Sequence, residues 1–169
     1  ALACMKHVGL NVALDPFMAA AITGVSGGLV VVEADDPGAH SSQSEQDNRH
    51  LARLAKVPVL EPADSQEAYE MMALAFELSE RFDTPVLVRT TTRISHSKSV
   101  VDVTGRHPRL GRQPAFPRDV GKYVMLPVNA RARRPLVEER LVKLLGHKGE
   151  PWVWQVSRVL RDGVGVEAR

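Results

Sequence analysis

The chain has 169 residues, of which 44% are hydrophobic and 25% charged, and its formal net charge is +2. This is the composition of a globular domain with an apolar core, and no run approaches the roughly 18 apolar residues that a membrane span requires. The only cysteine, Cys4, excludes an internal disulfide and a metal site built from thiolates alone.

The charge is distributed unevenly along the chain. Residues 1–101 hold 8 Lys and Arg against 13 Asp and Glu, and residues 102–169 hold the remaining 14 basic and 7 acidic side chains. The basic residues are spread out, which favours a solvated linker or partner surface over a nucleic-acid surface. The first residues have the pattern of a strand, with no secretion signal before it. We therefore expect a piece of a longer protein and a cytoplasmic location.

The first part of the chain alternates strands and helices. Residues 2–5 predict a strand, and residues 10–23 predict a helix that Gly24 ends. The β-branched run at 29–32 predicts a second strand. Because its apolar residues are continuous rather than alternating, both faces of this strand should be covered, as in a parallel sheet.

The alternation then continues. A helix is expected over 45–55 with Ser44 as its N-cap, followed by a short strand at 57–60. Asp64 begins a capping-box pattern for a helix over 64–82, and a strand at 86–88 follows it.

This order predicts an α/β fold with right-handed crossovers and a doubly wound, mainly parallel sheet. In such a sheet the strands end along one edge, where ligands bind. The polar loops at 6–11, 35–44 and 89–97 should therefore meet there.

Beyond residue 101 the periodicity is lost. Prolines and glycines predict a linker or extended segment over 102–134, with a short strand at 122–127. A helix is expected over 135–145, at the start of an uncertain tail, 135–169. The predicted organisation is a domain over 1–101, the linker and this tail.

Familiar chemical motifs are missing from the sequence. It has no Walker phosphate loop, no Gly-x-Ser-x-Gly elbow and no His-Glu-x-x-His. His40, His50 and His96 are too scattered to predict a metal site, and we assign no metal ligand. The pair Asp35-Asp36 suits Mg²⁺, but an acidic turn beside Pro-Gly is the more frequent explanation.

Four segments, in this order and spacing, resemble a known family: MKHVGLN from Met5, ADDPGAHSSQSEQDNR, VPVLEPADSQEAYEM and DTPVLVRTTTRISHS. They resemble the alpha subunits of indolepyruvate ferredoxin oxidoreductases, which are thiamine-diphosphate-dependent 2-oxoacid:ferredoxin oxidoreductases. The resemblance continues through KYVMLPVNARARRP and covers roughly residues 4–145. Four segments in register are more specific than any single motif.

The resemblance implies a fold and an activity. The matching region of the family is the pyrimidine-binding domain, a doubly wound α/β domain, here without its N-terminal part. A second domain of the family binds the diphosphate through Mg²⁺, and the complete subunit carries [4Fe-4S] clusters. The implied reaction decarboxylates an aryl 2-oxoacid such as indolepyruvate, transfers the acyl group to coenzyme A and reduces ferredoxin. The implied protein partner is the beta subunit; neither a nucleic acid nor a membrane is expected.

The resemblance also suggests site residues. Lys6 or His7 would stabilise the negative charge that develops on the substrate's carbonyl oxygen, and His7 and His40 would move protons. The remaining expected contacts are Met5, Gly9 and Asn11 with the cofactor, and Ser41, Gln43, Arg93 and His96 with the substrate.

The chain also departs from the family pattern. It begins after the family's Gly-Thr-Pro-Ser-type segment and after the glutamate that binds the aminopyrimidine. It also lacks a Gly-Asp-Gly…Asn diphosphate motif, which the Arg-Asp-Gly-Val-Gly at 161–165 does not replace. We therefore expect the chain alone to be inactive.

Two other functions fit parts of the sequence. A signalling module would use Asp35-Asp36 as a phosphoacceptor site, but it also needs a third acid and a lysine at neighbouring strand ends. A nucleic-acid-binding module would use the basic stretch at 106–134.

Overall fold

The computed structural model describes residues 1–103 and 115–146. Its centre is a sheet of four strands, β1 (Leu2–Lys6), β2 (Val30–Asp35), β3 (Val59–Leu60) and β4 (Val86–Thr91). Their order in the sheet is β1-β2-β4-β3, and every pair is parallel. The predicted α/β class with a parallel sheet is confirmed.

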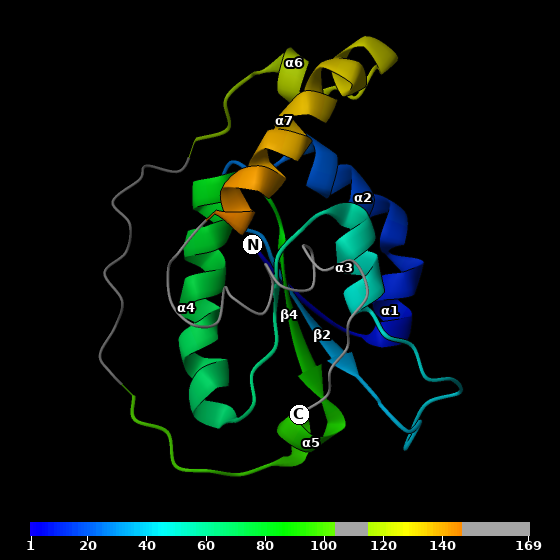
Figure 1. Ribbon diagram of the computed structural model, residues 1–169, viewed down its shortest axis with the longest axis vertical. Coiled ribbons are helices and arrows are strands. Elements are labelled where there is room, and N and C mark those ends of the chain that lie inside the picture. Colours follow the sequence, from blue (N-terminus) through cyan, green and yellow to red (C-terminus); the bar gives the residue numbers. More distant parts are fainter. Residues whose placement is uncertain (104–114, 147–169) are drawn as a thin grey trace.

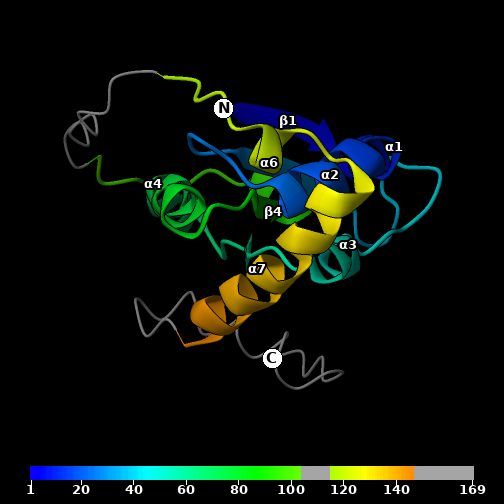
Figure 2. The same ribbon diagram turned by 90° about the horizontal axis from the view of Figure 1, so that it is seen from above.

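Helices cover both faces of the sheet (Figure 2). One face carries α1 (His7–Val12), α2 (Leu14–Thr23) and α3 (Arg49–Ala55), and the other carries α4 (Ser65–Phe82). Each face forms its own apolar cluster. The α4 cluster contains Val30, Leu60, Met71, Ala75, Leu78, Val86 and Val88, and the opposite cluster contains Leu10, Phe17, Ala21, Val31, Ala52, Ala55, Val57 and Leu87.

The register places the carboxyl ends of β1, β2 and β4 at the same edge of the sheet. Glu33 lies opposite Met5 on β1 and opposite Arg89 on β4, and Asp35 lies opposite Thr91. The strands β2 and β4 both end beside α5 (Thr92–His96), as Figure 1 shows. This short helix occupies part of the expected loop at 89–97.

Local signals set several helix ends as expected. The Asp64 carboxylate caps α4 by accepting from the Glu67 N–H at 2.9 Å, and Glu67 accepts from the Ala63 N–H at 2.7 Å. Gly24 ends α2 with a φ of 81°. The helix expected over 10–23 is instead two helices. The break follows from Pro16, which has no N–H to donate to the carbonyl four residues earlier.

The expected N-cap at Ser44 is wrong. The helix α3 begins at Arg49 with Asn48 at the N-cap position. Residues 36–48 form a loop instead. The Ser44 carbonyl, which would accept the first hydrogen bond of the expected helix, accepts from the His7 ring, and the Asp47 carboxylate accepts from the Arg49 N–H.

The predicted strand at 122–127 is also wrong. The structure has a single helical turn there, α6 (Val120–Tyr123), followed by the long helix α7 (Pro127–Leu145). Proline is favoured at the first position of a helix, so Pro127 begins α7 within the segment expected to be extended. None of the helices in the described part of the chain could span a membrane.

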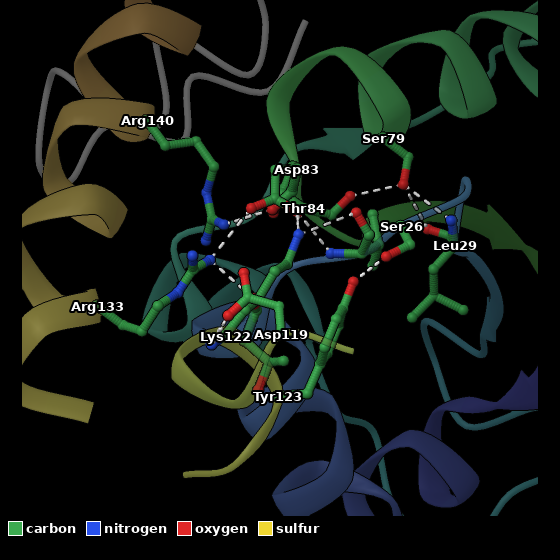
Figure 3. A network of polar contacts seen from close by, with 12 residues as sticks. Ser26, Leu29, Ser79, Asp83, Thr84, Asp119, Lys122, Tyr123, Arg133 and Arg140 are labelled. Atoms are coloured by element: carbon green, nitrogen blue, oxygen red, sulfur yellow. Dashed lines mark hydrogen bonds and ion pairs between the residues drawn. The ribbon is translucent and has the colours of Figure 1, made fainter. Parts of the chain in front are cut away.

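The helix α7 docks at the end of the sheet opposite α5 (Figure 1). Figure 3 shows Arg133, Arg140 and Lys122 converging on Asp83 and its surroundings. Arg140 donates to the carbonyl oxygens of Asp83, at 2.6 Å, and Ala21. Basic side chains of α6 and α7 thus bind polar groups that the ends of α2 and α4 leave exposed.

Candidate active site

Three segments meet at the edge where the strands end. The Lys6 Nζ, at the end of β1, donates to the Ser41 carbonyl at 2.9 Å and lies 3.8 Å from the Asp36 carboxylate. The Thr92 hydroxyl, which follows β4, donates to Asp36 at 2.7 Å. The loops after β1, β2 and β4 therefore come together, as a parallel sheet requires.

Asp36 is the residue that joins these segments. Its carboxylate accepts from the N–H groups of His40, at 3.2 Å, and Ser41, at 2.8 Å. It also accepts from the Ser42 hydroxyl at 2.6 Å and from Thr92. These hydrogen bonds hold the pKa of the Asp36 carboxyl well below its ordinary value. Asp36 is therefore a fully engaged anchor for the loop.

Among the other predicted site residues, His7 is the most enclosed. It is 0% exposed, its Nε2 lies 3.1 Å from the Ser44 carbonyl oxygen, and its own carbonyl accepts from the Asn48 side chain. Since a carbonyl only accepts, Nε2 carries the proton of this hydrogen bond. The His7 ring is thus buried inside the carboxyl edge of the sheet, whereas the Lys6 side chain is 39% exposed at that edge.

The predicted cofactor contacts lie beside His7. Met5 packs partly buried against the apolar cluster under α1. A Cβ on Gly9 would lie 3.1 Å from the Met5 Cβ, so the close approach that Gly9 permits is to this side chain. Asn11 is exposed and donates to Gln46 at 3.3 Å.

The predicted proton carrier His40 and the predicted substrate contacts are exposed on two segments. His40, Ser41 and Gln43 lie on the loop after β2. Arg93 and His96 lie on α5. Within the described ranges, no hydrogen bond joins either α5 side chain to the other predicted site residues. The structure thus brings Lys6, His7 and the 36–44 loop together, and places Arg93 and His96 at the same edge without a direct contact.

A polar cluster that the sequence analysis missed lies inside the same edge. Glu33 and Asp35 point to the α1 side of β2, where His7 also lies, and all three are buried. The Arg89 Nε donates to Asp35 at 2.6 Å, and Arg89 also pairs with Glu61. The alternation from Val31 through Glu33 to Asp35 was the available signal, because alternate strand residues share a face.

The cluster contains buried acceptors that have no donor. Burial raises the pKa of Glu33 to about 9, and the negative charge of the neighbouring Asp35 adds to this shift. In the part of the chain that the structure describes, His7 Nδ1, both Glu33 oxygens and Asp35 Oδ1 have no hydrogen-bond partner. Ligand atoms of the three residues lie within 4.8 Å of one another, so they are candidates to hold a metal ion.

Asp35 and Asp36 are adjacent in the sequence but have different surroundings. Asp35 faces the interior and pairs with Arg89, while Asp36 is engaged by the loop and by Thr92. A phosphoacceptor site would need an accessible, unengaged carboxylate, so the arrangement disfavours the signalling alternative. In the basic stretch proposed for nucleic acid, Lys122 and Arg133 bind Asp83; residues 106–114 lie outside the described residues.

Comparison with known proteins identifies similar sequences. A family model described as "Pyruvate flavodoxin/ferredoxin oxidoreductase, thiamine diP-bdg" matches residues 9–162. "Indolepyruvate oxidoreductase subunit IorA" of Methanothermobacter thermautotrophicus is 55% identical over 159 residues, which cover 94% of this chain and 25% of that protein.

Two further relatives carry the same name. The protein of Archaeoglobus fulgidus is 44% identical over 144 residues, 85% of this chain and 23% of its own length. That of Pyrococcus horikoshii is 45% identical over 148 residues, with the same two coverages of 85% and 23%. The chain thus spans about a quarter of the length of these relatives. No solved structure matches it.

Proposed function

Because the chain belongs to the thiamine-diphosphate-binding family of pyruvate flavodoxin/ferredoxin oxidoreductases, we propose that it forms one side of the active site of an aryl 2-oxoacid oxidoreductase. The proposed substrate is indolepyruvate, after which the relatives are named. The observation that carries the proposal is the contact of Lys6 with the 36–44 loop at the carboxyl edge of a parallel sheet.

The described residues fit the cofactor and an anionic substrate. The exposed amide of Asn11 offers a donor and an acceptor to an aminopyrimidine, next to the apolar surface of Met5 and Gly9, and the exposed amide of Gln43 offers the same to the substrate. When bound, thiamine diphosphate supplies the nucleophilic carbon that attacks the 2-oxoacid carbonyl. Its Mg²⁺ is proposed to be held by residues outside this chain.

The proposed roles follow from charge and exposure. Lys6 binds the carbonyl oxygen of the substrate as negative charge develops there, and a preorganised donor of this kind contributes about 3–4 kcal/mol. The exposed cations Arg93 and His96 bind the substrate carboxylate, and Ser41 orients the substrate through its hydroxyl.

The two histidines take different roles. His40 is exposed on the loop and is the proposed proton carrier. His7 is buried, so we propose that it acts as a positioning residue by holding the Ser44 carbonyl and with it the loop. Its direct participation in proton transfer stays a prediction.

The complete enzyme is proposed to use further components. The relatives are called subunits, which supports a partner subunit of the beta type. The family description names ferredoxin and flavodoxin, which supports ferredoxin as the electron acceptor, with [4Fe-4S] clusters held outside this chain. Coenzyme A as acyl acceptor and a cytoplasmic location complete the proposal. The chain alone, spanning a quarter of its relatives, is proposed to be inactive.

The test uses the complete enzyme, assembled from the full-length polypeptide and its partner subunit. Replacing Lys6 by Met should lower kcat/KM for indolepyruvate by about 10²–10³-fold, because an oxyanion donor is lost. Thiamine diphosphate binding should change little. The matched control is Lys98→Met, an exposed lysine beyond α5. Equal activity of Lys6→Met and the control would refute the proposed role, and activity of the chain alone would refute its proposed inactivity.

A further inference from the structure

A second site is indicated inside the carboxyl edge of the sheet. It consists of His7, the first residue of α1, and of Glu33 and Asp35 on β2. Their exposed fractions are 0%, 0% and 2%, and one ligand atom of each lies within 4.8 Å of the others. Two segments separated by more than twenty residues thus bring buried polar atoms close together.

When Glu33 is ionised, the atoms that these three residues bring together are all acceptors. The His7 Nε2 proton is used by the Ser44 carbonyl, so its Nδ1 presents a lone pair. Both Glu33 oxygens and Asp35 Oδ1 also have no hydrogen-bond partner among the described residues. Buried acceptors without a donor are costly, and a cation satisfies several of them at once.

The charges around the three residues point in the same direction. The carboxylates of Asp35, Asp47 and Glu61 pair with the guanidiniums of Arg49 and Arg89. The carboxyl group of Glu33 belongs to the same network through its electrostatic interaction with Asp35, Asp47 and Arg89. The network therefore has an excess of two negative charges when its acids are ionised. A divalent cation neutralises this excess, whereas a single proton on Glu33 leaves half of it.

We propose that His7 Nδ1, Glu33 and Asp35 Oδ1 bind a divalent transition-metal ion. One imidazole and two carboxylates suit Zn²⁺ and its neighbours in the first transition row. Mg²⁺ is disfavoured because it usually keeps several bound waters, and the three residues are enclosed. The site depends on neither the proposed reaction nor the Mg²⁺ of the cofactor.

Neighbouring groups already hold the ligands in position. The Arg89 Nε binds Asp35 Oδ2 at 2.6 Å, which leaves Oδ1 for the metal. The Ser44 carbonyl fixes the tautomer of His7 in the same way. Metal sites commonly orient their ligands through such hydrogen bonds.

The experiment uses the full 169-residue chain after treatment with a chelator. Titration with Co²⁺ and Zn²⁺, followed by absorption and calorimetry, should show one ion per chain. The variants Glu33→Gln and His7→Gln should weaken this binding at least about tenfold. The matched controls Glu77→Gln and His50→Gln, which alter exposed residues of α4 and α3, should leave it unchanged. Circular dichroism checks that each variant is folded.

A measurement on the unmodified chain keeps the proposal testable if a variant does not fold. In ¹⁵N spectra of the histidines, Zn²⁺ should shift Nδ1 of His7 while its Nε2 stays protonated. A folded chain that binds neither Co²⁺ nor Zn²⁺ would overturn the proposal. So would binding that survives both variants, or Zn²⁺ binding that leaves the His7 signals unchanged.

Discussion

Asp36 shows how one side chain can shape a whole loop. Its two oxygens bind two backbone N–H groups and a hydroxyl of its own loop, as well as Thr92 beyond β4. Lys6 lies within 3.8 Å of the same carboxylate. A charged acceptor is needed here, because hydrogen bonds to ionised groups are stronger than those to neutral ones.

Replacing Asp36 by Asn should loosen the 36–44 loop without unfolding the domain. An amide offers one acceptor oxygen and no charge, so several of these hydrogen bonds are lost. The N–H groups of His40 and Ser41 should then exchange with deuterium about tenfold faster or more. The exposed Asp102→Asn is the control. Unchanged exchange in Asp36→Asn would show that the loop is held by other contacts.

Gly24 is constrained by both its conformation and its surroundings. Its φ is 81°, and a Cβ would collide with the Asp83 carboxylate, which binds the Val25 N–H, Lys122 and Arg133. Gly24→Ala should therefore lower the free energy of unfolding by at least about 1 kcal/mol. At Gly27 an added Cβ meets nothing within 4 Å. In urea denaturation, Gly27→Ala should lower the free energy of unfolding clearly less than Gly24→Ala does. Equal losses for the two variants would contradict this explanation.

At the level of single residues, the sequence predicted those contacts that form between near neighbours in the chain. The capping pattern of Asp64 and Glu67 and the helix end at Gly24 need only a few neighbouring residues, and both are present. The His7–Glu33–Asp35 cluster was missed because its members become neighbours only when β1 and β2 pair. The burial of His7 was missed for the same reason.

Among the elements, α7 differs most from its prediction. Pro127 was predicted to end a short strand and Pro135 to begin a helix, yet the helix begins at the first and passes through the second. Because Pro135 has no N–H, the helix lacks the hydrogen bond to the Arg131 carbonyl, and Pro135 is exposed. Contacts with distant parts of the chain compensate. Arg133 and Arg140 bind the final carbonyls of α2 and the residues that follow α4, and no local pattern announces such contacts.

Arg140 should supply much of the free energy that holds α7 against the rest of the domain. The residue is 7% exposed, its guanidinium donates to the Asp83 and Ala21 carbonyls, and burial lowers its pKa. Arg140→Met removes both hydrogen bonds and leaves two carbonyls without these donors. We expect a loss of about 2 kcal/mol in the free energy of unfolding. Arg131→Met, an exposed change on the same helix, should cost little. Similar denaturation midpoints for the two variants would contradict this role of Arg140.

Over the whole molecule, the parallel sheet was predictable from the alternation of strand and helix patterns. That alternation depends on the period of apolar residues, which the packing of the core enforces. The structure places separate apolar clusters on the two faces, and both contain residues of β2 and β4. The domain should therefore unfold as one unit, because loss of either cluster exposes the shared strands.

Substitutions on the two faces test this cooperativity. Val31→Ala affects the cluster with α1, α2 and α3, and Val86→Ala affects the cluster with α4. Each should lower the free energy of unfolding by about 2 kcal/mol. In the double variant, the loss in the free energy of unfolding should equal the sum of the two single losses to within about 0.5 kcal/mol. Circular dichroism and hydrogen exchange should both show a single unfolding transition. Two separate transitions would show that the faces unfold independently.

The register of β2 sets how tolerant this region is to changes in length. Glu33 and Asp35 point to one face, whereas Val32, just before them, and Ala34, between them, point to the other. Deleting Val32 would transfer both carboxylates to the face of α4 and bury them among Met71, Ala75 and Leu78. We expect this deletion to abolish folding, as judged by circular dichroism, whereas Val32→Ala should fold. A family with this architecture should therefore vary β2 by substitution and accommodate insertions in the loop that follows it.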